Sequence, residues 1–193
     1  MEVKLTNISK FLSSSLYGED AFINNISIDS RDVKKGDLFI AIKGDNFDGH
    51  DFIDESIKNG ASAIVCNKSA IKECGNIPHI ICDDTIDALG VIACNLKKTM
   101  GQPFTIGVTG TNGKTSVTKL TAEILKQSFN VSTTIGNFNN DIGLPLSIFK
   151  AFNNETDKCV YELGASKKND ISQLVNICEP DMTTLLNVSE AHM

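Results

Sequence analysis

Residues 107–120, GVTGTNGKTSVTKL, have the form of a phosphate-binding loop that runs into a helix. The apolar run FTIGVTG comes before the loop and is rich in β-forming residues, which predicts a strand. The usual loop, G-x-x-x-x-G-K-[ST], would have a glycine at position 108, but valine stands there. After the loop, apolar residues recur at helical spacing, at Val117, Leu120, Ile124 and Leu125. The stretch therefore predicts a strand, a glycine-rich loop and a helix, with one departure from the common spacing.

A loop between a strand and a helix suits the phosphate chain of a nucleotide. Backbone N–H groups near Gly110 and Gly113 can turn inward because glycine tolerates the required dihedrals, and the helix N-terminus adds positive potential. Lys114 would supply charge for the β- and γ-phosphates, and Thr115 would place a hydroxyl on Mg²⁺. Taken alone, the same residues also fit a glycine turn that merely joins a strand to a helix, with Lys114 in solvent.

Two later runs read as buried strands that end in polar residues. KCVYELGAS has Glu162 at its strand end, and DMTTLLNVSEAHM has Asn187 at its strand end with His192 just beyond. Ligands of open α/β sheets bind at the carboxyl ends of the strands, so we expect Lys114, Glu162 and His192 to meet there. Singly, Glu162 could be a helix cap or an ion-pair partner, and His192, one residue from the chain end, could be disordered.

Composition excludes several classes of protein. The net charge of −6 and the sequence pI near 5.0 give no broad positive field to hold nucleic acid, so any phosphate would be bound locally. The N-terminal MEVKLTNISKFLSSSL lacks the apolar core of a signal peptide, and no run reaches the length of a membrane span. We expect a cytoplasmic protein with no nucleic-acid partner and no membrane insertion.

The six cysteines contain no C-x-x-C pair, and several lie in apolar runs such as AIVC and IIC. This pattern is typical of buried thiols in a reducing compartment, rather than of a disulfide framework or a zinc site. The cysteines are Cys66, Cys74, Cys82, Cys94, Cys159 and Cys178.

The first hundred residues predict a separate small α/β domain. FINNISI and DLFIAI read as short strands, and HDFIDESIKNG reads as a helix that stops at Gly60. ASAIVC and IPHIIC follow as strands, and DDTIDALGVIACNLKKTM follows as a helix with Asp84 or Thr85 as its cap. GQP at 101–103 then interrupts the pattern, which predicts a domain boundary near residue 100.

Four motifs together resemble the Mur ligases, the ATP-dependent amide-forming enzymes of peptidoglycan precursor synthesis. They are TGTNGKT, GNFNNDIGLPL, ELGAS followed by DISQL, and NVSEAHM. That family carries T-G-T-N-G-K-T in place of the common loop, so the resemblance accounts for valine at position 108. In the first part, DSRDVKKGDLFIAIKGDNFDGHDF resembles the UDP-binding domain of the members that act later in the pathway. GNFNNDIGLPL and ELGAS are most similar to the MurF type, which adds D-alanyl-D-alanine to UDP-N-acetylmuramoyl-tripeptide.

The resemblance covers nearly the whole chain and implies an α/β protein with two parts. Residues 1–100 would form the small domain that binds the UDP substrate. Residues 101–193 would form an incomplete, P-loop NTPase-like central domain with a mostly parallel sheet that binds ATP.

Complete members of the family are longer, with a third domain that closes over ATP and the incoming amine. The lysine that the family carbamylates to help hold the second metal would lie beyond residue 193. We therefore expect a fragment, or one piece of a split enzyme whose C-terminal portion is a separate chain. Such a chain would bind nucleotide weakly and not turn over alone, and it would expose a sheet edge and apolar faces through which it associates.

The resemblance assigns nucleotide and metal sites residue by residue. Lys114 would hold the ATP phosphates and Thr115 one Mg²⁺. Glu162 and His192 match further metal ligands, and with Lys114 they are the candidate catalytic residues. The second Mg²⁺ would lie between the γ-phosphate and the substrate carboxylate. The candidate ATP-binding residues are Thr109, Gly110, Thr111, Asn112, Gly113, Lys114, Thr115, Ser116 and Asn137.

The resemblance also assigns a substrate site. Ser30 and Arg31 of DSR, and His50 of DGHDF, would meet the uridine nucleotide. Asn139 and Asn140 lie in the polar run TIGNFNNDIGLP and would line the muramoyl-peptide site. Without the resemblance, the first three would be interpreted as a turn with a surface ion pair.

The implied chemistry is activation of a carboxylate. The terminal carboxylate of the UDP-linked peptide attacks the γ-phosphate to give an acyl phosphate and ADP, and the amine of D-alanyl-D-alanine then forms the amide. The first step brings two anions together, so two Mg²⁺ ions and Lys114 must neutralise charge. Two alternatives stay open: a sister ligase that adds another amino acid, and a non-catalytic nucleotide-binding piece of a split ligase.

Overall fold

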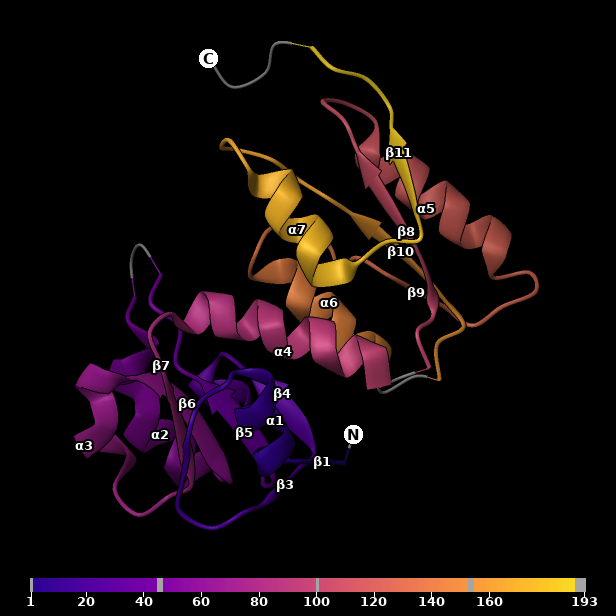
Figure 1. The fold of residues 1–193 in the computed structure, drawn as a ribbon. Helices are drawn as coiled ribbons and strands as arrows, with labels where there is room; N and C mark the ends of the chain where they lie inside the picture. Colours follow the sequence, from indigo (N-terminus) through magenta and orange to yellow (C-terminus); the bar gives the residue numbers. More distant parts are fainter. Residues whose placement is uncertain (1, 45–46, 100, 153–154, 190–193) are drawn as a thin grey trace. The chain divides into compact units, whose positions relative to one another are not determined.

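The computed structural model describes residues 2–44, 47–99, 101–152 and 155–189. The chain forms two compact units, Met1–Ile92 and Ala93–Met193 (Figure 1). The division between them falls within the long helix α4 (Thr85–Thr99), which belongs by its two halves to both units.

The first unit is built on a five-stranded sheet in the order β2-β7-β6-β5-β4. Strands β4 to β7 run parallel, and β2 pairs with β7 in the antiparallel direction. A separate antiparallel pair joins β1 and β3. The strands are β1 (Val3–Lys4), β2 (Leu16–Tyr17), β3 (Phe22–Ile23), β4 (Asn25–Ser27), β5 (Asp37–Ile40), β6 (Ala63–Asn67) and β7 (His79–Cys82).

The sequence predicted two helices of the first unit, α2 and α4, but not α1 or α3. α2 ends at Asn59 and is followed by Gly60 at its C-cap, whose φ of 110° is the left-handed conformation that glycine adopts without strain. The side chain of Asp84 accepts the backbone N–H groups of Ile86 and Asp87, so Asp84, not Thr85, caps α4. The helical segments are α1 (Leu5–Phe11), η1 (Ser30–Asp32), η2 (Gly49–Phe52), α2 (Ile53–Asn59), η3 (Lys68–Ala70) and α3 (Ile71–Cys74).

One predicted strand of the first unit is divided in the structure. FINNISI forms two strands, since β3 pairs with β1 whereas β4 pairs with β5. Between them the Asn24 N–H donates to the Gly36 carbonyl at 2.9 Å. A run of apolar and β-branched residues predicts extended backbone, but it does not say that its two halves find different partners.

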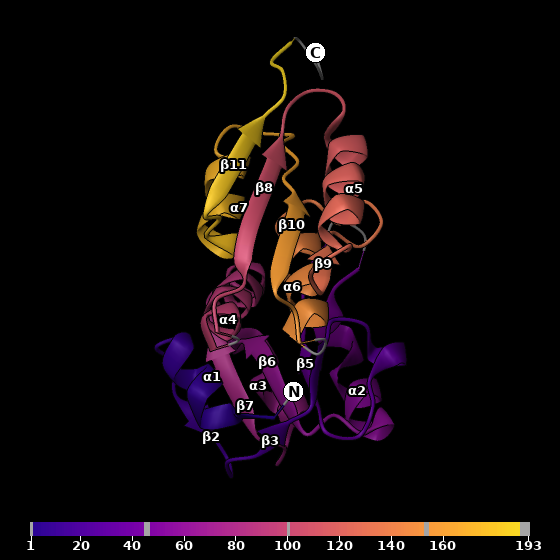
Figure 2. The ribbon, with the colours of Figure 1, turned by 90° about the vertical axis from the view of Figure 1, so that its right-hand side faces the viewer.

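The second unit is a four-stranded parallel sheet in the order β11-β8-β10-β9. Figures 1 and 2 show α5 on one face of this sheet and α6 with α7 on the other. Because β8 and β10 are neighbours and parallel, the loop after β8 lies beside the end of β10. The elements are β8 (Phe104–Thr109), α5 (Lys114–Leu125), β9 (Val131–Thr133), α6 (Gly143–Phe152), β10 (Lys158–Glu162), α7 (Asp170–Cys178) and β11 (Met182–Leu185).

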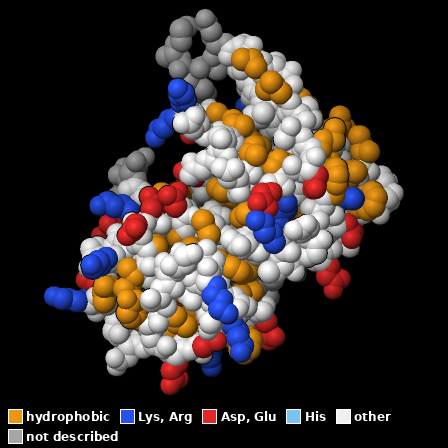
Figure 3. Space-filling model, in the orientation of Figure 1, with side chains coloured by type: hydrophobic (Ala, Val, Ile, Leu, Met, Phe, Trp, Pro, Cys, Tyr) orange, Lys and Arg blue, Asp and Glu red, His pale blue; other side chains and the backbone are white. Residues whose placement is uncertain are grey.

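The buried face of α5 differs from the predicted apolar stripe. Val117 and Leu125 pack against the core around Val108 and Val160, as predicted, but Leu120 and Ile124 are each 64% exposed. The buried face is instead centred on Thr118 and Ala122. The helical spacing predicted that Leu120 and Ile124 would be buried. The sheet instead covers the face of α5 that carries the smaller residues Thr118 and Ala122. Figure 3 shows hydrophobic side chains on the right-hand edge of the molecule, where α5 lies.

The distribution of surface charge and the exposed edge of the second sheet both match what the sequence predicts. On the face drawn in Figure 3, basic and acidic side chains are interspersed, with no broad positive patch. β11 is an edge strand of its sheet, and its Met182 and Leu185 are 53% and 63% exposed, so the expectation of a buried strand here is wrong. Association through this edge stays a prediction.

Within the described residues, no helix is long and apolar enough to cross a membrane.

The six cysteines are free thiols, and Cys66, Cys74, Cys159 and Cys178 are buried as the sequence predicts. Burial raises the pKa of Cys178 to about 12, and burial together with the neighbouring aspartates raises the pKa of Cys82 to about 11. Both thiols are therefore protonated and unreactive at neutral pH.

Candidate functional site

The glycine-rich loop spans the gap between β8 and α5, and its glycines are required by geometry. Val108 is still part of β8 and is 1% exposed in the core, so an apolar residue belongs where the common loop has glycine. The turn starts at Gly110, with φ of 142°, and ends at Gly113, with φ of 84°. A Cβ atom on Gly110 would lie 3.1 Å from the backbone nitrogen of Asn187. The loop therefore begins two residues later than in the common pattern.

The N-terminus of α5 presents backbone N–H groups without acceptors. Gly113 is the N-cap and offers no side chain to the first turn. Among the described residues, no acceptor is found for the N–H groups of residues 113–116. Free N–H groups at the start of a helix, together with the helix dipole, form an anion-binding site.

Lys114 lies over this loop instead of extending into solvent. Its Nζ donates to the carbonyl oxygens of Gly110 at 2.7 Å and Thr111 at 3.1 Å, and the side chain is partly buried. These contacts do not match a lysine extended into solvent, and its role in binding phosphate stays a prediction. The structure brings a positive charge beside the first turn of α5, whose N–H groups have no acceptor among the described residues.

Glu162 ends β10 as a buried carboxylate, 4% exposed. Its Oε2 accepts the Thr115 hydroxyl at 2.7 Å, and its Oε1 accepts the Asn139 amide at 2.8 Å. Its backbone N–H donates to the Thr134 hydroxyl at 2.7 Å. Within the described ranges, no basic side chain forms an ion pair with it, and it caps no helix.

A divalent cation fits this arrangement. A buried carboxylate without a cationic partner is costly, and bound metal is one of the few ways to compensate it. The carboxylate and the Thr115 hydroxyl are hard oxygen ligands of the kind Mg²⁺ prefers. Adjacent ligands of an octahedral Mg²⁺ lie roughly 3 Å apart, close to the 2.7 Å between Thr115 Oγ1 and Glu162 Oε2. These two oxygens could therefore share one ion.

Close packing explains how Asn139 reaches Glu162. A Cβ atom on Gly164 would lie 2.8 Å from the Asn139 side chain, so only glycine leaves room for the amide. The Gly164 N–H also donates to the Asn139 carbonyl at 2.9 Å. Asn140 instead accepts the Gly143 N–H at 2.8 Å and holds the start of α6. The substrate roles expected of both asparagines stay predictions.

Three further candidates of the second unit, Thr109, Ser116 and Asn137, lie within the described residues. Thr109 donates its hydroxyl to the Leu163 carbonyl at 3.0 Å, which ties the ends of β8 and β10 together. Ser116 and Asn137 are exposed. His192 lies outside the described residues, so its meeting with Lys114 and Glu162 stays a prediction.

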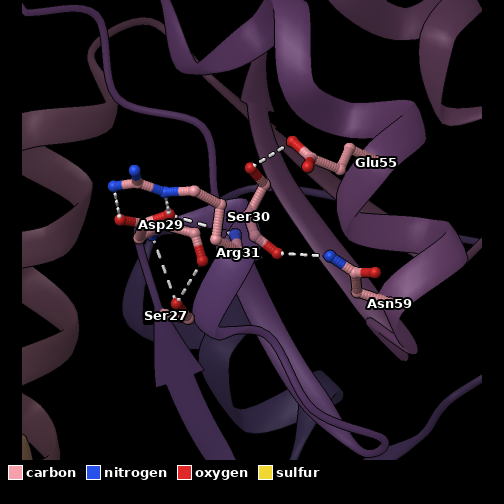
Figure 4. Close-up of polar contacts among 6 residues, drawn as sticks. All are labelled: Ser27, Asp29, Ser30, Arg31, Glu55 and Asn59. Carbon is pink, nitrogen blue, oxygen red and sulfur yellow. Dashed lines mark hydrogen bonds and ion pairs between the residues drawn. The ribbon is translucent and has the colours of Figure 1, made fainter.

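Two candidates of the first unit, Ser30 and Arg31, make polar contacts with neighbouring residues (Figure 4). The guanidinium of Arg31 makes two contacts with the Asp29 carboxylate, at 2.8 and 2.5 Å. This hydrogen bonding holds the pKa of Asp29 below its ordinary value. The Ser30 hydroxyl donates to Glu55 at 2.6 Å, and its carbonyl accepts from Asn59 at 2.8 Å. The Arg31 side chain is 78% exposed. Arg31 and Asp29 therefore match the turn with a surface ion pair that was expected without the family resemblance.

His50 is buried at 8% exposure, and both ring nitrogens have partners. The Asn67 N–H donates to Nε2 at 3.1 Å, so Nε2 is an acceptor and the neutral ring carries its hydrogen on Nδ1. Nδ1 then donates to the Asp48 carboxylate at 2.6 Å. A cavity of about 380 Å³ beside this residue is lined mainly by acidic side chains, Asp48, Asp51, Asp54 and Glu73. An acidic lining does not favour a diphosphate, and the uridine role of His50 stays a prediction.

Asp48 is expected to stabilise the first unit. Burial acts to raise its pKa, but hydrogen bonds from the His50 ring and backbone outweigh this and hold the pKa below 3.8. We expect Asp48→Ala to lower the free energy of unfolding by about 1 kcal/mol, the usual cost of losing a side-chain cap. Urea unfolding of the first unit at pH 7 measures this change.

The pH dependence provides the control for Asp48. A depressed folded-state pKa stabilises the fold above the unfolded pKa, so this contribution is present at neutral pH and lost as the pH falls below 3.8. Asp48→Asn keeps an acceptor oxygen for His50. It should lose only the part of the free energy of unfolding that depends on the charged carboxylate. An Asp48→Ala variant as stable as wild type at pH 7 would show that the contact with His50 contributes nothing.

Three residues that support the site were given no role from the sequence. Thr134 holds the backbone of Glu162, Gly164 makes room for Asn139, and Asn187 contacts the loop residue Asn112 at 2.9 Å. Thr134 and Asn187 each follow a strand of the sheet, as Glu162 ends one, and that shared position was the available signal.

Comparisons with known proteins agree with this geometry. The Mur ligase family catalytic-domain model matches residues 22–96, and the Mur ligase middle-domain model matches residues 108–193. UDP-N-acetylmuramoyl-tripeptide–D-alanyl-D-alanine ligase of Buchnera aphidicola is 38% identical over 193 residues, which are all of this chain and 41% of the relative.

Two solved structures are similar along most or all of the chain. MurF from Acinetobacter baumannii superposes with a TM-score of 0.91 at 27% identity, and covers 100% of this chain and 42% of its own. MurF ligase from Thermotoga maritima, solved in complex with ADP, has a TM-score of 0.78 at 36% identity and covers 88% of this chain and 38% of its own. The chain spans about two fifths of the length of the curated relatives it matches.

Proposed function

Because the chain belongs to the Mur ligase family, we propose that it carries the UDP-substrate-binding part and the phosphate loop of a cytoplasmic ligase. That ligase would use ATP and Mg²⁺ to join D-alanyl-D-alanine to UDP-N-acetylmuramoyl-tripeptide through an acyl phosphate. The name of the Buchnera relative, which aligns with the whole chain, supports this choice of amine and of peptide.

The observation that carries the proposal is the convergence of Lys114, Thr115 and Glu162. All three lie at the carboxyl ends of β8 and β10, beside the free N–H groups at the start of α5. In this assignment the N–H groups and Lys114 bind the phosphate chain, and the Thr115 hydroxyl and the Glu162 carboxylate hold Mg²⁺. When bound, ATP and Mg²⁺ supply the phosphoryl group and the charge neutralisation that activation of a carboxylate needs.

The residues of the chain do the positioning. Lys114 is already held at the loop by two carbonyl oxygens, so its charge is present where the anionic phosphate and carboxylate must approach. Glu162 is fixed from three sides, by Thr115, Asn139 and Thr134. A ligand set that is fixed in advance loses little entropy when it binds the metal.

The chain by itself is expected to bind rather than to turn over. It spans about two fifths of the length of its curated relatives, and we propose that turnover needs parts of those relatives that it does not match. Those parts are either attached to this chain or carried by a separate C-terminal chain. Adding them to the purified chain as a separate polypeptide tests this, because restored activity would show that a separate chain is sufficient.

The test is a calorimetric titration of the purified chain with ATP, in Mg²⁺ and in EDTA. We expect MgATP to bind, and Glu162→Gln to weaken that binding about tenfold through loss of one charged oxygen ligand. The same substitution should not weaken binding in EDTA, because no metal is then present for Glu162 to hold and loss of its negative charge does not oppose ATP. Glu123→Gln, on the exposed side of α5, is the matched control and should bind as wild type.

Two outcomes would contradict the proposal. Equal MgATP affinity in the wild-type and Glu162→Gln chains would remove Glu162 from the metal site. Phosphate release by the chain alone in the presence of UDP-N-acetylmuramoyl-tripeptide, dependent on both ATP and D-alanyl-D-alanine, would show that it turns over without further residues.

A further inference from the structure

Asn187 contacts the phosphate loop from the neighbouring strand. Its Oδ1 accepts the Asn112 N–H at 2.9 Å, and its Nδ2 donates to the Asn112 carbonyl at 3.0 Å. Its own backbone carbonyl accepts the Thr111 N–H at 3.1 Å. One residue, 75 positions further along the chain, therefore holds both backbone polar groups of Asn112.

The segment after β11 continues the pairing of β11 with β8 along the loop. The Leu186 N–H donates to the Thr109 carbonyl at 3.0 Å. The Ser189 N–H donates to the Thr111 hydroxyl at 3.0 Å, and that hydroxyl donates to the Ser189 carbonyl at 3.2 Å. Figure 2 shows β11 beside β8, with the chain running on past the sheet. The loop is thus paired with a second segment of backbone on one side.

This pairing explains why residue 110 is glycine. A Cβ atom there would lie 3.1 Å from the Asn187 nitrogen and 3.2 Å from its carbonyl oxygen. Gly110 also has a φ of 142°, which side-chain-bearing residues rarely adopt. The loop sequence is therefore matched to the approach of Asn187.

The contact also decides which N–H groups remain for a ligand. The Asn112 N–H is taken by Asn187, so it does not point to a phosphate. The next N–H groups, from Gly113 to Ser116, have no acceptor among the described residues. Lys114 is held by the carbonyls of Gly110 and Thr111, which lie in the paired segment.

We propose that Asn187 is a positioning residue for the phosphate loop. By holding Asn112 toward β11, it directs the N–H groups of Gly113, Lys114 and Thr115 toward the diphosphate or triphosphate of a bound nucleotide. This inference rests on the proposed function, because it assigns those groups to a nucleotide. Asn187 acts through the loop and does not touch the ligand.

Three variants separate the contributions of the side chain. Asn187→Leu has a similar size but no hydrogen-bonding group. Asn187→Asp keeps an acceptor for the Asn112 N–H but loses the donor and adds negative charge near the phosphates. Val188→Ala, at a neighbouring residue that is 81% exposed, is the matched control.

The first readout needs no nucleotide. Amide hydrogen exchange followed by NMR should show the Asn112 N–H exchanging about fivefold faster in Asn187→Leu, the effect of one ordinary hydrogen bond. Asn187→Asp should retain protection at Asn112, and Val188→Ala should match wild type. Unchanged exchange in Asn187→Leu would overturn the inference.

The second readout is the affinity for MgADP measured by calorimetry. We expect the Kd of Asn187→Leu to rise about tenfold, since two hydrogen bonds that order the loop are lost. The midpoint of thermal unfolding should stay close to wild type, because Asn187 is exposed. A wild-type chain that binds MgADP, with Asn187→Leu binding equally well, would also overturn the inference. A wild-type chain that does not bind MgADP would count against nucleotide binding by this chain, and the exchange experiment would then decide the role of Asn187 alone.

Discussion

We expect Lys114→Ala to bind MgATP about thirtyfold to a hundredfold more weakly than the wild-type chain, the size of a lost hydrogen bond to a charged partner. The lysine is held at the loop by the carbonyl oxygens of Gly110 and Thr111. Its charge is therefore in place before the nucleotide arrives, and no other side chain of the loop GTNGKT carries a positive charge. In a complete ligase the same change should reduce phosphoryl transfer most, because charge is concentrated in that step.

Calorimetry measures this effect, with Lys119→Ala as the control. Lys119 lies on the same helix and is exposed, so its removal changes the net charge by the same amount without touching the loop. Equal losses of affinity in the two variants would mean that only net charge matters. That result would remove Lys114 from the phosphate site.

The second large effect is expected at Gly143, the first residue of α6. A Cβ atom there would lie 2.5 Å from both the Cα and the Cβ atoms of Phe138. The clash is with backbone, so the loop that carries Asn139 would have to move. We expect Gly143→Ala to destabilise the second unit by about 3 kcal/mol, as in severe overpacking. Urea unfolding followed by circular dichroism gives this value.

Gly136→Ala is the matched control in the same loop. Gly136 has a φ of 54°, but no atom lies within 4 Å of a Cβ built on it. Its replacement should cost only about 1 kcal/mol, from the left-handed conformation alone. If the two variants were equally stable, the close approach of Phe138 to α6 would be absent in solution.

Much of the second unit could be predicted from local patterns. The strand, loop and helix around Lys114 follow from glycine positions and apolar spacing, and Glu162 follows from its place at the end of an apolar run. The family resemblance accounted for valine at position 108, and the structure adds the physical reason, because Val108 faces the core and the loop starts at Gly110.

Other features depend on which distant segments meet, and local patterns do not carry that information. Asn139 reaches Glu162 across 23 residues through space left by Gly164, and Asn187 reaches Asn112 across 75. The buried side of α5 was misjudged for the same reason, since the sheet decides which face is covered. His192 lies outside the described residues and stays a prediction.

The measurement that tests the central claim most directly is paramagnetic line broadening by Mn²⁺ with ATP, recorded on the backbone amide NMR signals of the wild-type chain. Mn²⁺ takes the same oxygen ligands as Mg²⁺ and broadens signals of nearby nuclei. The account predicts the strongest broadening at Thr115, Glu162 and their neighbours along the loop. Broadening centred on the acidic side chains around His50, with sharp signals at Thr115 and Glu162, would contradict it.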